Sequence, residues 1–362
     1  MRAAVAVALT LLAAPLGAQT LEGPELYAGE QALYEAAARE GHVAALNTPP
    51  GFANWAAVIR GFEQRYPHVL LTYNAAGQGA ALETMERTRG RPTADVVYLP
   101  GFVAVDAASR GLLAALPPER RPPGFDRIAP ALRDPAGQWI AVHQAPVVFA
   151  VNRRRVRQPV RSWADLKRAD LRGQVVYASP RSLIEGVAVA LAAAAATGQG
   201  AGLETVQPGL DLLGEIHRAG SIQRIETQAA IGPRFLRGEI GVWVGLEPDI
   251  LRTRHIDGFG EEMEVVAPAE GTASLPFAVA ILRGARNETA ARLWLNYVLS
   301  EAGQRLFAEG LVRPAVPITL AGETAQRLGA IAKLETPDQL RIAFRLADIQ
   351  RGWARIPGAA DR

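Results

Sequence analysis

The stretch WIAVHQAPVVFAVN, residues 139–152, is apolar over a greater length than one ordinary strand and carries Pro146 in its middle. Proline removes a backbone donor and is poorly tolerated in a central strand. We therefore expect two strands here, joined by a crossing between two parts of the molecule at residues 143–146. A second apolar stretch, ASLPFAVAILRG at 273–284, has a proline near its start and predicts a second crossing.

Strands and helices alternate before the first crossing. Strands are expected at 42–47, 68–74 and 94–99, and helices at 29–41, 52–67, 79–90 and 102–113. Alternation of this kind is typical of α/β folds with a largely parallel sheet. The segment 94–99 is almost wholly apolar, as a strand buried on both faces should be.

A second α/β unit is expected between the crossings. Its helices are predicted at 162–173, 180–198 and 207–220, and its strands at 174–179, 240–245 and 261–271. After the second crossing, residues 287–310 predict two successive helices, and the amphipathic tail 338–356 predicts a helix that docks on the first unit. The fold class is thus α/β with two lobes: lobe one is 21–143 plus 276–362, and lobe two is 147–272.

Composition favours a soluble globular protein. The 362 residues exceed one ordinary core, and 49% hydrophobic with 21% charged residues is an average balance. The formal net charge is only +3 and no basic block occurs, which argues against nucleic acid as a partner.

The first residues have the pattern of a secretory signal. Arg2 precedes an apolar run from Ala3 to Ala14, and Leu16–Ala18 ends at a suitable cleavage point before Gln19. The run is shorter than the roughly 20 residues that a membrane span needs. We expect a signal peptide at 1–18 and a mature protein without stable membrane insertion.

The chain contains no cysteine. Disulfides, zinc–thiolate sites and cysteine catalysis are therefore excluded, and a lipid anchor on cysteine is not expected. The sequence also lacks a nucleophile elbow, a Ser/His/Asp order and a histidine-rich metal motif. A secreted enzyme is accordingly disfavoured.

Three segments carry a resemblance to a known family. They are YLPGFVAVDAASRGLLAAL at 98–116, SWADLKRADLRGQVVYASP at 162–180 and RLWLNYVLSEAGQRLFAEGLVRPA at 292–315. In this order after a signal, the chain resembles the periplasmic substrate-binding proteins of ABC importers, in the group of ferric-iron, polyamine and phosphonate binders. The resemblance runs from about Leu33 to Arg313.

The resemblance implies a type II periplasmic-binding fold, in which two lobes close on a small solute by hinge motion. It implies delivery of that solute to a membrane permease of an ABC transporter. A monomer without cofactor is expected.

Ligands of α/β lobes sit beyond the carboxyl ends of the strands, near helix N-termini. In lobe one this rule selects Thr48 after the first strand, the loop Gly77, Gln78 and Gly79 after the second, and Pro100 after the third. Two glycines in the loop would let the backbone approach a ligand closely. The alternative for this loop is a plain turn.

In lobe two the same rule selects Ser179, Arg181 and Ser182 in the stretch VVYASPRSLIEG at 175–186. Ser179 is the expected N-cap of the following helix, with Pro180 as its first residue. Free backbone N–H groups and the helix dipole favour an anion there. Arg181 would add a bidentate partner for a carboxylate or phosphonate, so we expect an anionic solute.

Two other ligands stay open. Trp243 and Glu247 could hold a polyamine, although a tryptophan in an apolar strand is more often part of a core. Ferric-iron binders of the family use neighbouring tyrosines in lobe two, whereas the corresponding stretch GVWVGLEPDIL at 241–251 contains none. The five histidines are scattered, so no metal site is expected, and His143 at the crossing predicts a hinge hydrogen bond.

Overall fold

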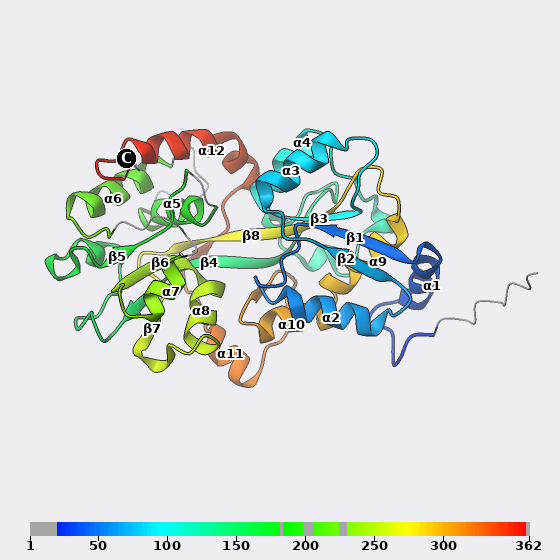
Figure 1. The fold of residues 1–362 in the computed structure, drawn as a ribbon, viewed down its shortest axis with the longest axis horizontal. Coiled ribbons are helices and arrows are strands. Elements are labelled where there is room, and N and C mark those ends of the chain that lie inside the picture. The colour runs from blue at the N-terminus through cyan, green and yellow to red at the C-terminus, as the bar shows by residue number, and fades with distance from the viewer. Residues whose placement is uncertain (1–19, 182–183, 199–205, 224–229, 360–362) are drawn as a thin grey trace, which may run out of the picture.

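Two α/β halves lie side by side in a computed structural model that describes residues 20–181, 184–198, 206–223 and 230–359 (Figure 1). The long strands β4 (Ile140–Asn152) and β8 (Thr272–Ile281) run from one half into the other. The predicted signal, residues 1–18, lies outside the described ranges. The strand order is β2-β1-β3-β8-β4-β6-β5, and the expected α/β fold of two lobes is confirmed.

Lobe one is built on three parallel strands, with β8 antiparallel beside β3. The strands are β1 (His42–Leu46), β2 (Leu70–Tyr73) and β3 (Val96–Pro100). Its helices are α1 (Glu30–Glu40), α2 (Trp55–Arg65), α3 (Gln78–Arg87), α4 (Gly101–Ser109), α9 (Glu288–Leu299) and α10 (Glu301–Glu309). The strands alternate with helices as the sequence predicts, so their carboxyl ends meet at the edge that faces lobe two.

Lobe two repeats this arrangement around the second half of β4. Its strands are β5 (Val175–Val176), β6 (Val242–Leu246) and β7 (Met263–Val266), and its helices are α5 (Ile184–Ala196), α6 (Gln207–Arg218), α7 (Ile231–Leu236) and α8 (Glu247–His255). The chain then adds β9 (Arg313–Pro314), α11 (Gly322–Leu328), β10 (Leu334–Glu335) and α12 (Gln339–Ala354).

The first crossing is one continuous strand rather than the two strands that Pro146 suggested. A β-bulge lies between Ala141 and His143, and Pro146 is the last residue of β4 to pair with β8. The next residue, Val147, opens the pairing with β6. The missing amide of Pro146 therefore falls where the strand changes partners, and the proline is tolerated there.

Two helix predictions in lobe two need correction. Residues 162–173 form two short 3-10 turns instead of an α-helix, although the Asp165 amide does donate to Ser162 Oγ (3.1 Å) and the Ser162 amide to the Asp165 carboxylate (3.0 Å). Helix α5 begins at Ile184, not at Pro180. The expected N-cap at Ser179 is wrong, because Pro180 and Arg181 lie in a turn and not in a helix.

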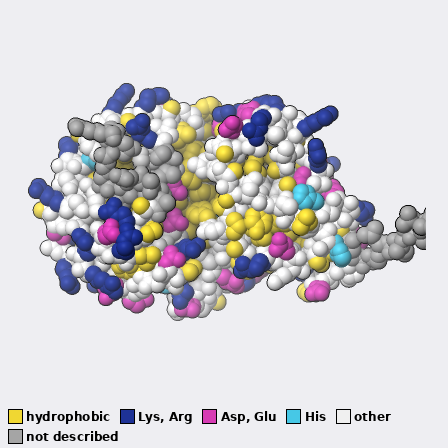
Figure 2. All heavy atoms as spheres, in the orientation of Figure 1, with side chains coloured by type: hydrophobic (Ala, Val, Ile, Leu, Met, Phe, Trp, Pro, Cys, Tyr) yellow, Lys and Arg dark blue, Asp and Glu magenta, His cyan; other side chains and the backbone are white. Residues whose placement is uncertain are grey.

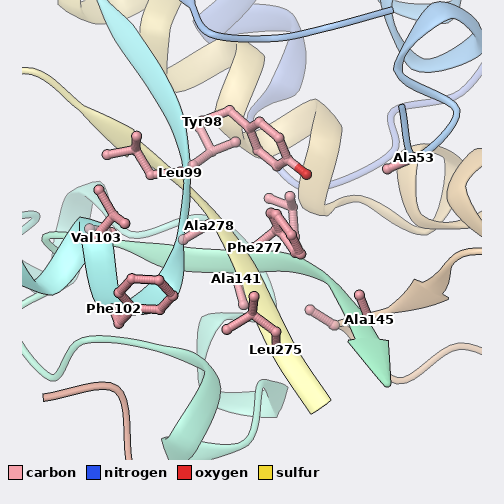
Figure 3. Close-up of a cluster of buried hydrophobic side chains, with 14 of the residues drawn as sticks. Ala53, Tyr98, Leu99, Phe102, Val103, Ala141, Ala145, Leu275, Phe277 and Ala278 are labelled. Atoms are coloured by element: carbon pink, nitrogen blue, oxygen red, sulfur yellow. The ribbon is translucent and has the colours of Figure 1, made fainter. Parts of the chain in front are cut away.

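The hinge region is packed with hydrophobic side chains from several elements. Figure 3 shows Tyr98 and Leu99 of β3, Phe102 of α4, and Leu275 and Phe277 of β8 around the crossing strands. These side chains are buried. They tie the two crossing strands to lobe one.

The tail departs from its prediction as well. Helix α12 contacts α4 of lobe one, as expected, but it also contacts α5 and α6 of lobe two. In Figure 1 the helix lies across the top of lobe two, and the chain reaches it from the lobe-one side. The amphipathic pattern predicted a docking helix without specifying its two partners.

Candidate functional site

The loops of lobe one that face lobe two are tied together by Asn47. Its side-chain amide donates to the Tyr98 carbonyl (2.9 Å), and its side-chain oxygen accepts from the Gly77 amide (2.8 Å). Its backbone amide donates to the Asn74 side chain (2.9 Å). Asn47 has a φ of +58°, a left-handed conformation that asparagine tolerates. One residue thus positions the ends of β1, β2 and β3.

The predicted lobe-one residues fall into two groups. Gly77 and Gly79 are exposed, and a Cβ added at either position would have no neighbouring atom within 4 Å. Gln78 between them is half-buried. Thr48 lies next to Asn47 and is buried. The glycine loop is therefore open to an approaching solute, and Thr48 forms part of the packed floor beneath it.

Pro100 is covered by the protein itself. It is buried and pairs with Phe277 of β8. A Cβ placed on the next residue, Gly101, would lie 2.7 Å from the Gln339 side chain and 3.0 Å from Pro276. The start of α4 therefore has no space for a ligand, and this geometry does not support the predicted contact at Pro100.

The turn at residues 179–181 lies on lobe two, with Pro180 buried, Ser179 half-buried and Arg181 exposed. The Arg181 amide donates to Ser179 Oγ (3.3 Å), and Gln350 of α12 donates to the carbonyls of Pro180 (3.3 Å) and Arg181 (3.4 Å). The turn folds against α5, where a Cβ on Gly186 would lie 2.4 Å from its backbone. Within the described ranges, the Arg181 guanidinium makes no hydrogen bond or ion pair. Ser182 lies outside those ranges.

Trp243 and Glu247 are both engaged within the protein. Trp243 packs with Phe235 and Ile250 in the core of lobe two. Glu247, 4% exposed, receives two hydrogen bonds from Arg313 of β9, at 2.6 and 2.8 Å. Glu247 is thus an internal anion with its own cation, and sequence reasoning missed Arg313 because it is 66 residues away.

A second carboxylate pair lacks such a cation. Burial raises the pKa of Asp249 in α8 to about 7, and the negative charge of Glu185 in α5 adds to this increase. Burial also raises the pKa of the Glu185 carboxyl, one oxygen of which has no hydrogen-bond partner among the described residues. Neither carboxylate forms an ion pair in that part of the chain. The sequence pointed to Asp249 beside Glu247, but nothing in it brings Glu185 close.

A further hydrogen bond joins the lobes at α8, and another lies at the crossing within lobe one. Arg252 of α8 donates to the Gly51 carbonyl of lobe one (2.9 Å). At the crossing, the Tyr98 hydroxyl and Nε2 of His143 share a hydrogen bond (2.6 Å), and burial lowers the pKa of His143 to about 3, which keeps the ring neutral. The predicted hinge hydrogen bond of His143 is confirmed. Figure 2 shows hydrophobic side chains along the seam between the halves, with acidic groups beside it.

Metal ligands and membrane spans are both missing from the described part of the chain. No three His, Asp or Glu side chains gather there in a way that could hold a metal ion. No helix in those ranges is long and apolar enough to cross a bilayer.

Comparison with known proteins gives consistent matches. The family model described as bacterial extracellular solute-binding protein matches residues 91–342. An uncharacterised protein of Haemophilus influenzae is 29% identical over 260 residues, which are 68% of this chain and 70% of that protein.

Solved structures share the fold. The periplasmic binding protein AfuA of Actinobacillus pleuropneumoniae, with exogenous fructose-6-phosphate bound, has a TM-score of 0.68 and 24% identity, covering 88% of this chain and 98% of that one. Trichodesmium FutA in complex with iron and citrate has a TM-score of 0.69 and 17% identity, covering 88% and 100%. At these identities the structures establish the fold and leave the ligand open.

Proposed function

The chain belongs to the bacterial extracellular solute-binding proteins, and we propose that it captures a small anionic solute in the periplasm for the permease of an ABC importer. Membership of a family of binding proteins confirms the expectation that the chain is not an enzyme. Cleavage after Ala18 and a monomeric state stay predictions.

One observation carries the proposal. The two lobes are joined through the paired strands β4 and β8, and Arg252 of α8 in lobe two donates to the Gly51 carbonyl in the loop after β1 of lobe one. Paired strands that link two compact lobes can act as a hinge, so the lobes can close on a solute. We propose lobe boundaries at 21–143 with 276–362, and at 147–272.

The anion preference rests on Arg181 and the glycine loop. Arg181 has a guanidinium without a protein partner in the described ranges, and Gly77 with Gly79 offers open backbone on the other lobe. A guanidinium binds carboxylate or phosphate oxygens in pairs. AfuA is described with a sugar phosphate bound, and we extend that chemistry to this chain as part of the proposal, with Ser179 and Ser182 in support.

An amine is the second candidate. Glu185 and Asp249 are largely desolvated carboxylates with no ion pair in the described ranges, and an ammonium group would compensate their charge. This pair replaces the combination of Trp243 and Glu247 that the sequence suggested for a polyamine. A ferric ligand has less support, because residues 241–251 contain no tyrosine, although FutA is described with iron and citrate.

Titration calorimetry of the mature protein tests the proposal with four probes: fructose-6-phosphate, a simple alkylphosphonate, spermidine and ferric citrate. We expect binding of a phosphate or phosphonate, accompanied by a smaller radius of gyration in scattering as the lobes close. Binding of spermidine alone would replace the anion with the amine. Tight binding without compaction would contradict closure about the β4–β8 hinge.

Variants separate the two ligand classes. Arg181→Ala should weaken an anionic probe by about tenfold to a hundredfold, the usual contribution of a charge-assisted hydrogen bond. Glu185→Gln should weaken spermidine instead and leave the anion nearly unaffected. If Arg181→Ala binds the phosphate as tightly as the wild type, the arginine is only a surface charge.

A further inference from the structure

Helix α12 provides a third connection between the lobes, besides β4 and β8. It packs on α4 in lobe one and on α5 and α6 in lobe two. The crossing strands and this helix lie in different places around the lobes (Figure 1). A helix attached to both lobes constrains any rotation about the crossing strands.

The N-terminal end of α12 is anchored on lobe one. Asp338 caps the helix by accepting from the amides of Leu340 (2.9 Å) and Arg341 (3.3 Å). Gln339, only 3% exposed, lies against Gly101 at the start of α4. Because Gly101 has no side chain, the helix comes close to lobe one at this point.

The C-terminal end is anchored on lobe two by a chain of polar side chains. The Trp353 indole donates to the Tyr177 hydroxyl (2.8 Å), and that hydroxyl shares a hydrogen bond with Nε2 of His217 (2.7 Å), whose pKa burial lowers to about 4. Gly352 packs directly on Leu210 of α6. Trp353 itself is buried in the same contact.

Between these anchors, Gln350 contacts the turn at 179–181. Its side-chain amide donates to the carbonyls of Pro180 and Arg181, the backbone of the residues that present the guanidinium of Arg181. Both carbonyls point at one donor from a helix that is also fixed to lobe one. The position of this turn therefore depends on α12.

We propose that α12 is an interlobe strap in which Gln350 acts as a positioning residue for the ligand-binding turn 179–181. The strap limits how far the lobes open, and Gln350 holds the turn in the orientation that presents Arg181 to the solute. This inference rests on the proposed function for the role of the turn, whereas the strap itself is a property of the unliganded protein.

The absence of cysteine allows a ligand-free test of the strap. Arg87→Cys in lobe one and Arg172→Cys in lobe two, both exposed, accept spin labels whose separation is measured by pulsed electron resonance. Gln350→Glu keeps the size of the side chain and removes its donor, and Trp353→Phe removes the indole donor. We expect either change to broaden the distance distribution toward longer separations. Phe344→Ser, on the same helix and 75% exposed, is the matched control and should leave it unchanged.

A binding measurement completes the test. Gln350→Glu should weaken fructose-6-phosphate by about threefold to tenfold, the loss expected for neutral hydrogen bonds. Unchanged distances in both variants, with circular dichroism confirming the fold, would overturn the strap. Unchanged affinity in Gln350→Glu would overturn the positioning role. If no anionic probe binds the wild type, the proposed function fails while the distance result still decides the strap.

Discussion

The two lobes differ in how their residues at the boundary between them are bonded. We call these two sets of residues the lobe-one rim (Asn47, the loop Gly77–Gly79 and the start of α4) and the lobe-two rim (the turn 179–181, Glu185 and Asp249). In lobe one, Asn47 after β1 is hydrogen-bonded to β3 and to the segment after β2, and Gln339 and Pro276 cover the start of α4. In lobe two, Arg181 is exposed on its turn, and the carboxylates of Glu185 and Asp249 have no ion pair in the described ranges. Charged groups without protein partners are poor contributors to stability and good candidates for recognition. We therefore infer that the lobe-one rim provides support and the lobe-two rim selectivity.

The largest expected effect on stability is that of replacing Glu247. Unlike Arg181, Glu185 and Asp249 of lobe two, this residue has an ion-pair partner within the described ranges. Glu247→Gln removes the charge that compensates Arg313 at a largely buried contact between α8 and β9. We expect the free energy of unfolding to fall by about 3 kcal/mol, since one charge of a buried pair is left uncompensated. Urea unfolding measures it, with the exposed pair member Glu323→Gln on α11 as the control. If Glu247→Gln is as stable as the wild type, Glu247 does not support the fold and becomes a candidate for ligand recognition.

Replacing Asp249 should raise the free energy of unfolding, whereas replacing Glu247 should lower it. Its folded-state pKa of about 7 lies above the ordinary value of 3.8, so its contribution to stability is present below pH 3.8 and is lost as the pH rises through 7. Asp249→Asn removes this loss and should stabilise the protein by about 2 kcal/mol at pH 8. Melting temperatures between pH 4 and 8 test it. A destabilised variant at pH 8 would show that the carboxylate is structurally paired.

Asn47 tests the lobe-one side of the comparison. Asn47→Gly keeps the left-handed backbone accessible but deletes the bonds to Gly77 and Tyr98. We expect a loss of about 1–2 kcal/mol of stability, the cost of two buried hydrogen bonds partly replaced by water. Asn47→Ala, which adds backbone strain, should lose more. Equal stability of the glycine variant and the wild type would mean that the rim holds without Asn47.

Arg181 should have the smallest effect on stability. Its guanidinium is exposed and unpaired in the described ranges, so Arg181→Ala should change the free energy of unfolding by less than about 0.5 kcal/mol. The same variant carries the large expected loss in anion binding, and the contrast between the two numbers is the clearest signature of a recognition group. A loss of stability comparable to that of Asn47→Gly would remove the distinction between the rims.

Local pattern predicted most of the secondary structure. Buried parallel strands at 42–47 and 94–99 were identifiable because an apolar run of that length, bounded by helices, has few alternatives. The start of α5 could not be identified from the sequence, because Ser-Pro next to an alanine-rich run is by propensity a good helix start. The turn at 179–181 instead packs on Gly186 and is held by Gln350, which lies 170 residues from Pro180.

The residues of the candidate site also differ in whether local sequence features could identify them. Arg181, Ser179 and the loop Gly77–Gly79 could be selected from the sequence, because strand ends and helix starts are local features and strand order follows from their alternation. The roles of Trp243 and Glu247 could not, since burial in the lobe-two core and the pairing with Arg313 depend on distant segments. The same holds for Glu185, whose charge acts on Asp249 although the two residues are 64 positions apart in the chain.

The sequence by itself determined that this protein has two α/β lobes, two crossings and a set of strand-end loops. Hydrophobic periodicity and the positions of proline and glycine set these features, and both depend only on residues close together in the chain. Only the tertiary structure decided that β4 crosses without a break, that α12 ties lobe one to lobe two, and which charged groups are compensated. The physical reason is that the pairing and burial of a group depend on its neighbours in space. For Glu247 and Arg313 these neighbours lie 66 residues apart along the chain, and for Pro180 and Gln350 they lie 170 apart.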